Sequence, residues 1–166
     1  MKVFLAGATG AIGKCLVPLL VNAGHKVTGT TRHPGKAESI RLAGGTPVVV
    51  NGFSAREVLE AVQRAEPDVI IHQLTAIPAS FNLRRFDEEF ALTNQLRSEG
   101  TDHLLAAARA VGCRRFIAQS YAGWPCARTG ACPLLTSPEP KIRQTFQAKE
   151  CASEPGLVDF VTALRQ

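Results

Sequence analysis

Short apolar runs alternate with longer amphipathic segments along the chain. The short runs predict strands, and segments whose apolar side chains recur every three or four residues predict helices. Strands that alternate with helices pair in parallel through right-handed crossovers, so the pattern predicts an α/β fold, a doubly wound parallel sheet with helices on both faces. The predicted strands are residues 3–6, 26–31, 48–50, 68–74, 115–119 and 157–164. Two predicted helices begin near Ile12 and near Ser54, and two more cover residues 87–111 and 141–153.

The predicted strand at residues 68–74 is almost continuously apolar, which is typical of a strand covered by helices on both faces. In a Rossmann-type fold, the strands, about six in number, would take the order 3-2-1-4-5-6. The chain has 166 residues, which is the length of one ordinary domain. We therefore predict a single Rossmann domain over residues 1–166.

Composition and charge narrow the class of protein further. Apolar residues make up 45% of the chain and charged residues 20%, a globular mixture that excludes disorder, and no apolar run reaches the roughly 18 residues that span a bilayer. The net charge of +5 fits either an anionic ligand or general surface charge, and no basic block with interleaved aromatics indicates a nucleic acid. The five cysteines lack C-x-x-C spacing, and the four histidines are scattered, so we expect reduced thiols and no metal site. A soluble cytoplasmic protein without membrane or nucleic-acid partners is the expectation.

The residues Gly7-Ala8-Thr9-Gly10-Ala11-Ile12-Gly13 lie where the first predicted strand meets the first predicted helix. A pyrophosphate must approach backbone N–H groups at a helix N-terminus, and side chains there would obstruct it. Gly7 would permit the sharp turn, Gly10 the close approach and Gly13 the packing of the helix on the strand. The spacing is G-x-x-G-x-x-G rather than the commoner G-x-G-x-x-G. The pattern favours nucleotide binding over the alternative, a glycine-rich turn without a ligand.

The end of the second predicted strand, Thr30-Thr31-Arg32-His33, bears on the choice of cofactor. An NAD site usually places an acid there for the ribose 2′-hydroxyl, whereas NADP requires a cation for the 2′-phosphate. No Asp or Glu lies between Gly24 and Ala37, and Arg32 can pair with a phosphate through two hydrogen bonds. NADP is therefore favoured over NAD. The alternative is that Arg32 is an ordinary surface arginine.

An ordered set of motifs covers about the first 125 residues and resembles a known family. The set comprises MKVFLAGATGAIG at the N-terminus, TTR after the second predicted strand, DVIIHQLTA around the fourth, the run from Asn94 to Gly100-Thr101, and LLAAARAVGCRRFIAQSYAGW from Leu104 to Trp124. The chain resembles the short-chain dehydrogenase/reductases, in particular the extended or atypical NAD(P)-dependent epimerase/dehydratase branch. The resemblance implies a dinucleotide cofactor and hydride transfer on an unidentified small molecule of the carbonyl or sugar type. A homodimer is compatible with it.

The resemblance also implies roles for individual residues. Asn94 is similar to the family's helix asparagine, although the stretch to Gly100 is longer than usual, and Ser120 matches the catalytic serine that polarises a substrate carbonyl. The alternative for Ser120 is a cap at the end of a strand. The residues implied at the cofactor are Gly7, Gly10 and Gly13 at the pyrophosphate with Thr9, Ala11 and Ile12 lining it, Arg32 at the 2′-phosphate, Asn51 at the adenine, and Leu74, Thr75 and Ala76 beside the ribose.

Two features depart from the family pattern. The Tyr-x-x-x-Lys motif is absent, because Tyr121 is the only tyrosine and Pro125 stands four residues later. Tyr121 is a candidate in its place, but adjacent side chains on an extended chain point to opposite faces, so a turn is needed for Ser120 and Tyr121 to share a substrate. The family's C-terminal substrate-binding region also has no counterpart in these residues. The alternatives to an enzyme are therefore a non-catalytic NADP-binding sensor or regulatory module, and a truncated, inactive family member.

Overall fold

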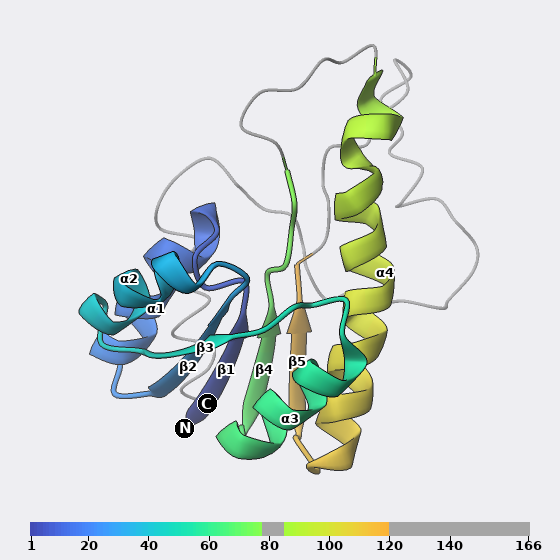
Figure 1. The fold of residues 1–166 in the computed structure, drawn as a ribbon. Coiled ribbons are helices and arrows are strands. Elements are labelled where there is room, and N and C mark those ends of the chain that lie inside the picture. The colour runs from blue at the N-terminus through green and yellow to red at the C-terminus, as the bar shows by residue number, and fades with distance from the viewer. Residues whose placement is uncertain (78–84, 120–166) are drawn as a thin grey trace, which may run out of the picture.

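The computed structural model describes residues 1–77 and 85–119, which form one parallel sheet with helices on both faces (Figure 1). The strand order is β3-β2-β1-β4-β5, as predicted for the first five strands of a Rossmann-type sheet. The predicted helix at residues 141–153 and the predicted strand at 157–164 lie outside the described residues. The elements in chain order are β1 (Lys2–Ala6), α1 (Ala11–Asn22), β2 (Lys26–Thr31), the 3₁₀ helix η1 (Pro34–Lys36), α2 (Ala37–Leu42), β3 (Thr46–Val49), α3 (Ala55–Ala65), β4 (Val69–His72), α4 (Phe86–Ala110) and β5 (Arg115–Ala118).

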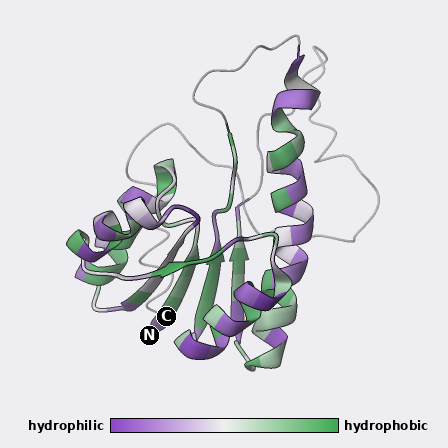
Figure 2. Ribbon diagram, viewed as in Figure 1, coloured by the Kyte–Doolittle hydropathy of each residue, from purple (hydrophilic) through white to green (hydrophobic). Residues whose placement is uncertain are grey.

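The hydrophobic core has two layers, one on each face of the sheet. Alternate residues of a strand point to opposite faces, so Val3 and Leu5 of β1 pack with α1 and α2, while Phe4 and Ala6 pack with α3 and α4. All residues of β4 are buried, in agreement with the prediction of a strand covered on both faces. Figure 2 shows the hydrophobic central strands beside helices that combine hydrophobic and hydrophilic residues. The sheet is therefore a rigid platform for whatever its edge carries.

The N-terminus of α3 is fixed by the capping residues that the sequence contains. The Ser54 side chain accepts a hydrogen bond of 3.3 Å from the Glu57 N–H, as expected of an N-cap. The Glu57 carboxylate in turn accepts a 2.9 Å bond from the N–H of Asn51, three residues before the cap. These two hydrogen bonds fix the path of the chain between β3 and α3.

Two strand boundaries differ by two residues from the prediction, and the others agree to within one. β3 begins at Thr46 rather than at residue 48, and it contains Pro47, which is tolerated because β3 is an edge strand and needs no hydrogen bond on its outer side. β4 ends at His72 rather than at Leu74. The Leu74 N–H donates to the His72 ring at 3.1 Å instead of to a neighbouring strand, so the strand pairing stops there.

Helix α4 is the longest described element, with 25 residues, and its N-terminal half rises beyond the strand ends (Figure 1). Its C-terminal half packs on the sheet through Leu104, Ala107 and Ala108. Within residues 1–77 and 85–119, no helix has the combination of length and apolar character that a bilayer crossing requires.

Candidate functional site

Most of the predicted site residues lie at one edge of the sheet. Because all five strands are parallel, their carboxyl ends share this edge, which is where open α/β sheets bind ligands. The glycine turn follows β1, Arg32 follows β2, Asn51 follows β3, and Leu74 and Thr75 follow β4. Ser120 and Tyr121 come after β5 in the sequence but lie outside the described residues.

Gly7 makes the sharp turn at the end of β1. Its φ of +92° lies in the region that side chains disfavour, and a Cβ built on it would stand 2.5 Å from the Gln73 carbonyl oxygen. The neighbouring Gln73 N–H donates to the Ala6 carbonyl at 2.8 Å. The chain after β1 therefore passes against the end of β4 at a distance that only glycine permits.

Gly10 and Gly13 have different steric surroundings. A Cβ on Gly13 would collide with the backbone of Ala8, at 2.7 Å from its Cα, so this glycine lets α1 pack against the turn. Gly10, in contrast, is exposed, and a Cβ there would meet only the Gly7 carbonyl oxygen, at 3.3 Å. Gly10 is thus accessible to a ligand, and a side chain there would press on a single backbone oxygen, far less than at Gly13.

The N-terminus of α1 presents backbone donors at the same place. Gly10 is the N-cap residue and provides no side-chain hydrogen bond. Its N–H is bound by the Gly7 carbonyl at 3.1 Å, but the N–H groups of Ala11, Ile12 and Gly13 have no acceptor among the residues that the structure describes. Such donors, with the positive end of the helix dipole, form a site suited to a phosphate group.

Two threonines at the end of β2 hold the glycine turn in place. The Gly7 N–H donates to the Thr30 hydroxyl oxygen at 3.0 Å, and the Ala8 N–H donates to the Thr30 carbonyl at 3.0 Å. The hydroxyl oxygens of Thr9 and Thr31 lie 3.2 Å apart, within hydrogen-bonding distance. The turn is therefore positioned before any ligand arrives, and its first two N–H groups are already satisfied.

Arg32 lies directly after β2 and is exposed. It forms no hydrogen bond or ion pair with any residue in the described part of the chain. The local turn is set by its neighbours instead, since the His33 N–H donates to the Thr31 hydroxyl oxygen at 3.2 Å. The guanidinium is thus available to an anion at the strand end.

Asn51 is exposed at the end of β3, and part of its side chain is already used. Its Oδ1 accepts a 3.2 Å hydrogen bond from the Phe53 N–H, so the residue also has the structural role of shaping the turn before α3. The side-chain NH₂ group has no acceptor among the described residues and can donate a hydrogen bond.

Leu74 and Thr75 differ in the direction of their side chains. The Leu74 side chain packs with the core between the sheet, α3 and α4. Its Cδ1 lies close to Gly52, at 3.1 Å from a Cβ built on that glycine. Its backbone N–H is taken by His72. Of the two residues only Thr75 is exposed, so a contact of Leu74 with a cofactor would come from the remaining backbone rather than from the side chain.

A cavity of about 220 Å³ lies beside these residues, and two of its lining side chains were not among the predicted site residues. His72 is 5% exposed, and Arg97 reaches the cavity from α4. Burial and the nearby positive charge of Arg97 lower the pKa of His72 to about 4, against the opposing effect of a hydrogen bond with the backbone of Leu96. His72 is therefore neutral near pH 7.

Of the two α4 residues, Arg97 lines this cavity and Asn94 does not. Asn94 is exposed, whereas Arg97, three residues before Gly100, lies at the cavity, with its Nη2 3.5 Å from the Gln119 carbonyl oxygen. In the sequence, Arg97 could have been found by its position three residues before Gly100. Within the described residues, no three His, Cys, Asp or Glu side chains lie close enough to hold a metal ion.

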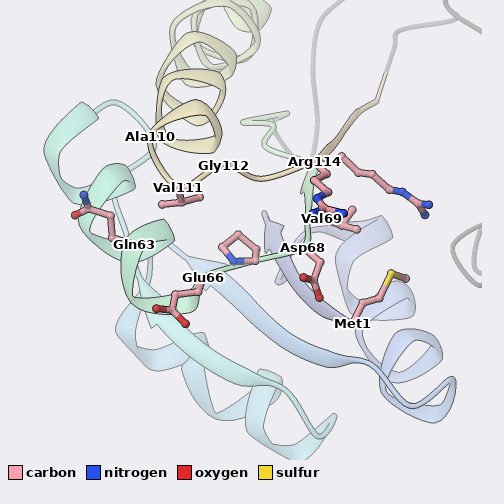
Figure 3. A pocket seen from close by; sticks show the side chains of 11 residues that line it. Met1, Gln63, Glu66, Asp68, Val69, Ala110, Val111, Gly112 and Arg114 are labelled. Carbon is pink, nitrogen blue, oxygen red and sulfur yellow. The ribbon is translucent and has the colours of Figure 1, made fainter.

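The opposite edge of the sheet has a larger hollow, of about 780 Å³ (Figure 3). It lies below the amino ends of β1, β4 and β5 and is far along the strands from the glycine turn. Its lining combines acidic and basic side chains: Glu66, Asp68, Arg114 and Arg115. This mixture of charges favours neither an anionic nor a cationic ligand. The carboxyl edge, with its open turn and unpaired amides, is the better candidate site.

Known proteins resemble this chain both in sequence and in fold. The sequence matches the family model described as NAD(P)H-binding over residues 7–154. It is 41% identical over 157 residues to a Streptomyces protein named 3-diazoavenalumate denitrifying reductase, a match that covers 89% of this chain and 49% of that protein. It is 31% identical over 117 residues to the 4-hydroxy-2-methyl-3-oxo-4-farnesyl-3,4-dihydroquinoline-1-oxide ketoreductase of Stigmatella aurantiaca, covering 70% of this chain and 32% of that protein.

A solved structure shows the same fold. The UDP-glucose 4-epimerase of Thermus thermophilus, solved with NAD, matches with a TM-score of 0.59 at 24% identity over 70% of this chain and 36% of that one. The fold match and the family match confirm the Rossmann-type sheet and the resemblance to NAD(P)-binding proteins. The chain spans about half the length of the Streptomyces reductase and about a third of the other two proteins.

Proposed function

The chain belongs to the NAD(P)H-binding family, and we propose that it is the cofactor-binding part of an NADP(H)-dependent reductase. The glycine turn and the N-terminus of α1 would hold the pyrophosphate. The observation that carries this proposal is the set of three N–H groups, of Ala11, Ile12 and Gly13, that lack acceptors among the described residues and lie beside the accessible Gly10. A linked pair of phosphates fits that donor set in charge and in hydrogen bonding.

Preference for NADP is the second part of the proposal. Arg32 is exposed and follows β2, the strand whose end carries the ribose-recognition residue in dinucleotide-binding sheets. No carboxylate stands between Gly24 and Ala37 to hold a free 2′-hydroxyl or to repel a 2′-phosphate. Arg32 would pair with the 2′-phosphate, and the Asn51 NH₂ group would donate to the adenine.

The chemistry is proposed for the region beyond β5. The bound reduced dinucleotide would supply a hydride, and Ser120 would donate a hydrogen bond to the substrate oxygen. Tyr121 is the one tyrosine available as a proton donor, and the sequence lacks Tyr-x-x-x-Lys to lower its pKa in the way usual for such reductases. The chain's own residues thus support binding and orientation better than strong acid catalysis.

Because the Tyr-x-x-x-Lys motif is absent, we favour a substrate whose reduction does not require protonation of an oxygen atom. Transfer of a hydride to the ring carbon of an aryldiazonium cation would form a carbon–hydrogen bond, break the carbon–nitrogen bond and release dinitrogen. The charges balance without a proton, so no alkoxide is left for a tyrosine to protonate. The Streptomyces relative carries the name of a reductase of this kind. Diazo compounds are therefore the second substrate class that we propose, beside carbonyl compounds.

Calorimetric titration with NADPH and with NADH tests the proposal. We expect NADPH to bind more tightly than NADH, and the absence of binding by either at millimolar concentration would reject the assignment. Turnover is then measured by NADPH absorbance with a panel of carbonyl and diazo compounds. NADPH that binds but is not consumed by any of them would favour the non-catalytic sensor.

A further inference from the structure

Four polar side chains in the described part of the chain are buried, and all of them support the backbone at the carboxyl edge of the sheet. They are Thr30, Thr31, His72 and Thr93. The two adjacent threonines hold the glycine turn, and the His72 ring accepts the Leu74 N–H. Thr93 differs from the other three, because it comes from α4 rather than from a strand.

The Thr93 side chain connects α4 to the chain that follows β4. Thr93 is 3% exposed, and its Oγ1 accepts a hydrogen bond of 3.1 Å from the N–H of Ala76, a residue 17 positions earlier. The C-terminal half of the same helix packs on the sheet through Leu104 and Ala107. The bond therefore fixes Ala76 relative to the sheet.

Thr75 keeps its polar groups available between residues that are held. Within residues 73–76, the N–H groups of Gln73, Leu74 and Ala76 all donate to the protein, at 2.8, 3.1 and 3.1 Å. The N–H and the hydroxyl of Thr75 have no partner among the described residues, and the side chain is exposed. Bonds on both sides therefore fix the backbone of Thr75 and leave two donors for a ligand.

The order of the strands indicates which part of the cofactor Thr75 would meet. The 2′-phosphate is proposed to bind at Arg32 after β2, and the pyrophosphate at the turn after β1. β4 lies next to β1 on the side away from β2. Because the pyrophosphate joins the two halves of NADP, a cofactor that crosses from β2 to β1 continues over β4 with its nicotinamide ribose.

We propose that Thr93 is a positioning residue for the cofactor: through Ala76 it holds Thr75 where the Thr75 N–H and hydroxyl bind the nicotinamide ribose. The inference rests on the proposed function, because it assigns a role within the same site. Donors that are held in place before the ligand arrives reduce the ordering cost of binding. Loss of the Thr93 acceptor should therefore weaken ligands that carry the nicotinamide half and spare those that lack it.

Calorimetric titration with NADP⁺ and with adenosine 2′,5′-bisphosphate, which lacks the nicotinamide half, tests this role. Thr93→Val removes the acceptor at nearly constant shape, and Thr93→Ala removes it with a smaller side chain. In both variants we expect the affinity for NADP⁺ to fall by roughly five- to tenfold and the affinity for the bisphosphate to change by less than about twofold. Thr93→Ser keeps the acceptor and should bind NADP⁺ within about twofold of the unsubstituted chain.

Hydrogen exchange of the Ala76 amide in the ligand-free chain checks the bond itself. Exchange should be at least about tenfold faster in Thr93→Val than in the unsubstituted chain, whereas the Gln73 amide, which is bound within the sheet, should be unchanged. Ser98→Ala is the matched control, because Ser98 is exposed on the same helix and its hydroxyl bonds to carbonyls of that helix. It should alter neither the exchange at Ala76 nor the affinity for either ligand.

The unsubstituted chain decides the proposed function, and the Thr93 variants decide the inference. Equal weakening of NADP⁺ and the bisphosphate in Thr93→Val and Thr93→Ala would show a purely structural role and would overturn the inference. Unchanged affinity for NADP⁺ in these variants would overturn it as well. If the unsubstituted chain binds neither ligand, the proposed function is rejected and the inference falls with it.

Discussion

The backbone N–H of Gly7 donates a 3.0 Å hydrogen bond to the side-chain oxygen of Thr30, a residue 23 positions later that is 4% exposed. This bond ties the turn after β1 to the end of β2. Together with the Thr9 and Thr31 hydroxyls, it sets the turn that leads to the N-terminus of α1, where the cofactor phosphates are proposed to bind.

Thr30→Val is the first test of this arrangement. Valine has nearly the same shape but cannot accept the Gly7 hydrogen bond, and this part-buried N–H left without a partner costs up to about 1–3 kcal/mol. We expect the free energy of unfolding, measured by urea denaturation, to fall by that amount and NADPH to bind more weakly. Thr30→Ser keeps the acceptor and should lose much less, so equal losses in the two variants would show that the hydroxyl is unimportant.

Gly10→Val and Gly13→Ala should separate cofactor binding from folding. A Cβ on Gly10 would press only on the Gly7 carbonyl oxygen, at 3.3 Å, so Gly10→Val should lower the free energy of unfolding by only about 1 kcal/mol and yet abolish NADPH binding by calorimetry. Gly13→Ala pushes a Cβ into the backbone of the turn and should destabilise the fold itself.

Gly35→Ala provides the control for these two variants. Nothing lies within 4 Å of a Cβ built on Gly35, and its φ is not positive, so it should affect neither property. A Gly10→Val protein that still binds NADPH with unchanged affinity would place the phosphates elsewhere.

Arg32→Gln should reverse much of the preference for NADPH. The substitution removes a charge-assisted hydrogen-bonded pair with the 2′-phosphate. The affinity for NADPH should therefore fall by roughly ten- to a hundredfold, and the affinity for NADH should change by less than about threefold. Arg56→Gln, an exposed arginine on α3, serves as the control. If NADPH and NADH weaken equally in Arg32→Gln, the side chain does not read the 2′-phosphate.

The buried His72 should make stability depend on pH. Its pKa is lowered to about 4 in the folded chain, chiefly by burial, whereas an ordinary solvated histidine has a pKa of 6.5, so the unfolded chain binds the proton more readily. The free energy of unfolding should therefore have its full value above pH 6.5 and fall by about 3 kcal/mol as the pH drops from 6.5 to 4.

His72→Asn removes the titrating group and leaves a side-chain oxygen that can accept from the Leu74 N–H. Urea denaturation at several pH values should show a flatter profile for this variant between pH 6.5 and 4. Titration of the His72 ring near pH 6.5 by NMR in the folded protein would contradict the account.

Much of this structure follows from local pattern. The helix start near Ser54 and the steric need for Gly7 could be predicted because apolar spacing and glycine conformation act over a few residues. The order of the five strands followed from the Rossmann-type topology that alternating strands and helices predict. The start of β3 was predicted two residues too late because proline is unfavourable in a strand unless the strand lies at the edge of the sheet. Whether a strand lies at an edge is known only once the sheet has assembled.

The cavity side chains were missed for a related reason. His72 and Arg97 are 25 positions apart, and nothing in the sequence marks them as neighbours until β4 and α4 pack together. The end of β4 also depends on a side chain, since the His72 ring takes the Leu74 N–H that a longer strand would have used. The roles of Ser120 and Tyr121 stay predictions.

The central claim is that the first amides of α1 hold the phosphates of the cofactor, and amide NMR shifts during titration of the labelled chain with NADPH test it most directly. The account predicts saturating shifts at Ala11, Ile12 and Gly13, with smaller ones at Arg32. Shifts confined to the opposite edge, at Gln63, Gly112 and Arg115, or no shifts at millimolar NADPH, would contradict it.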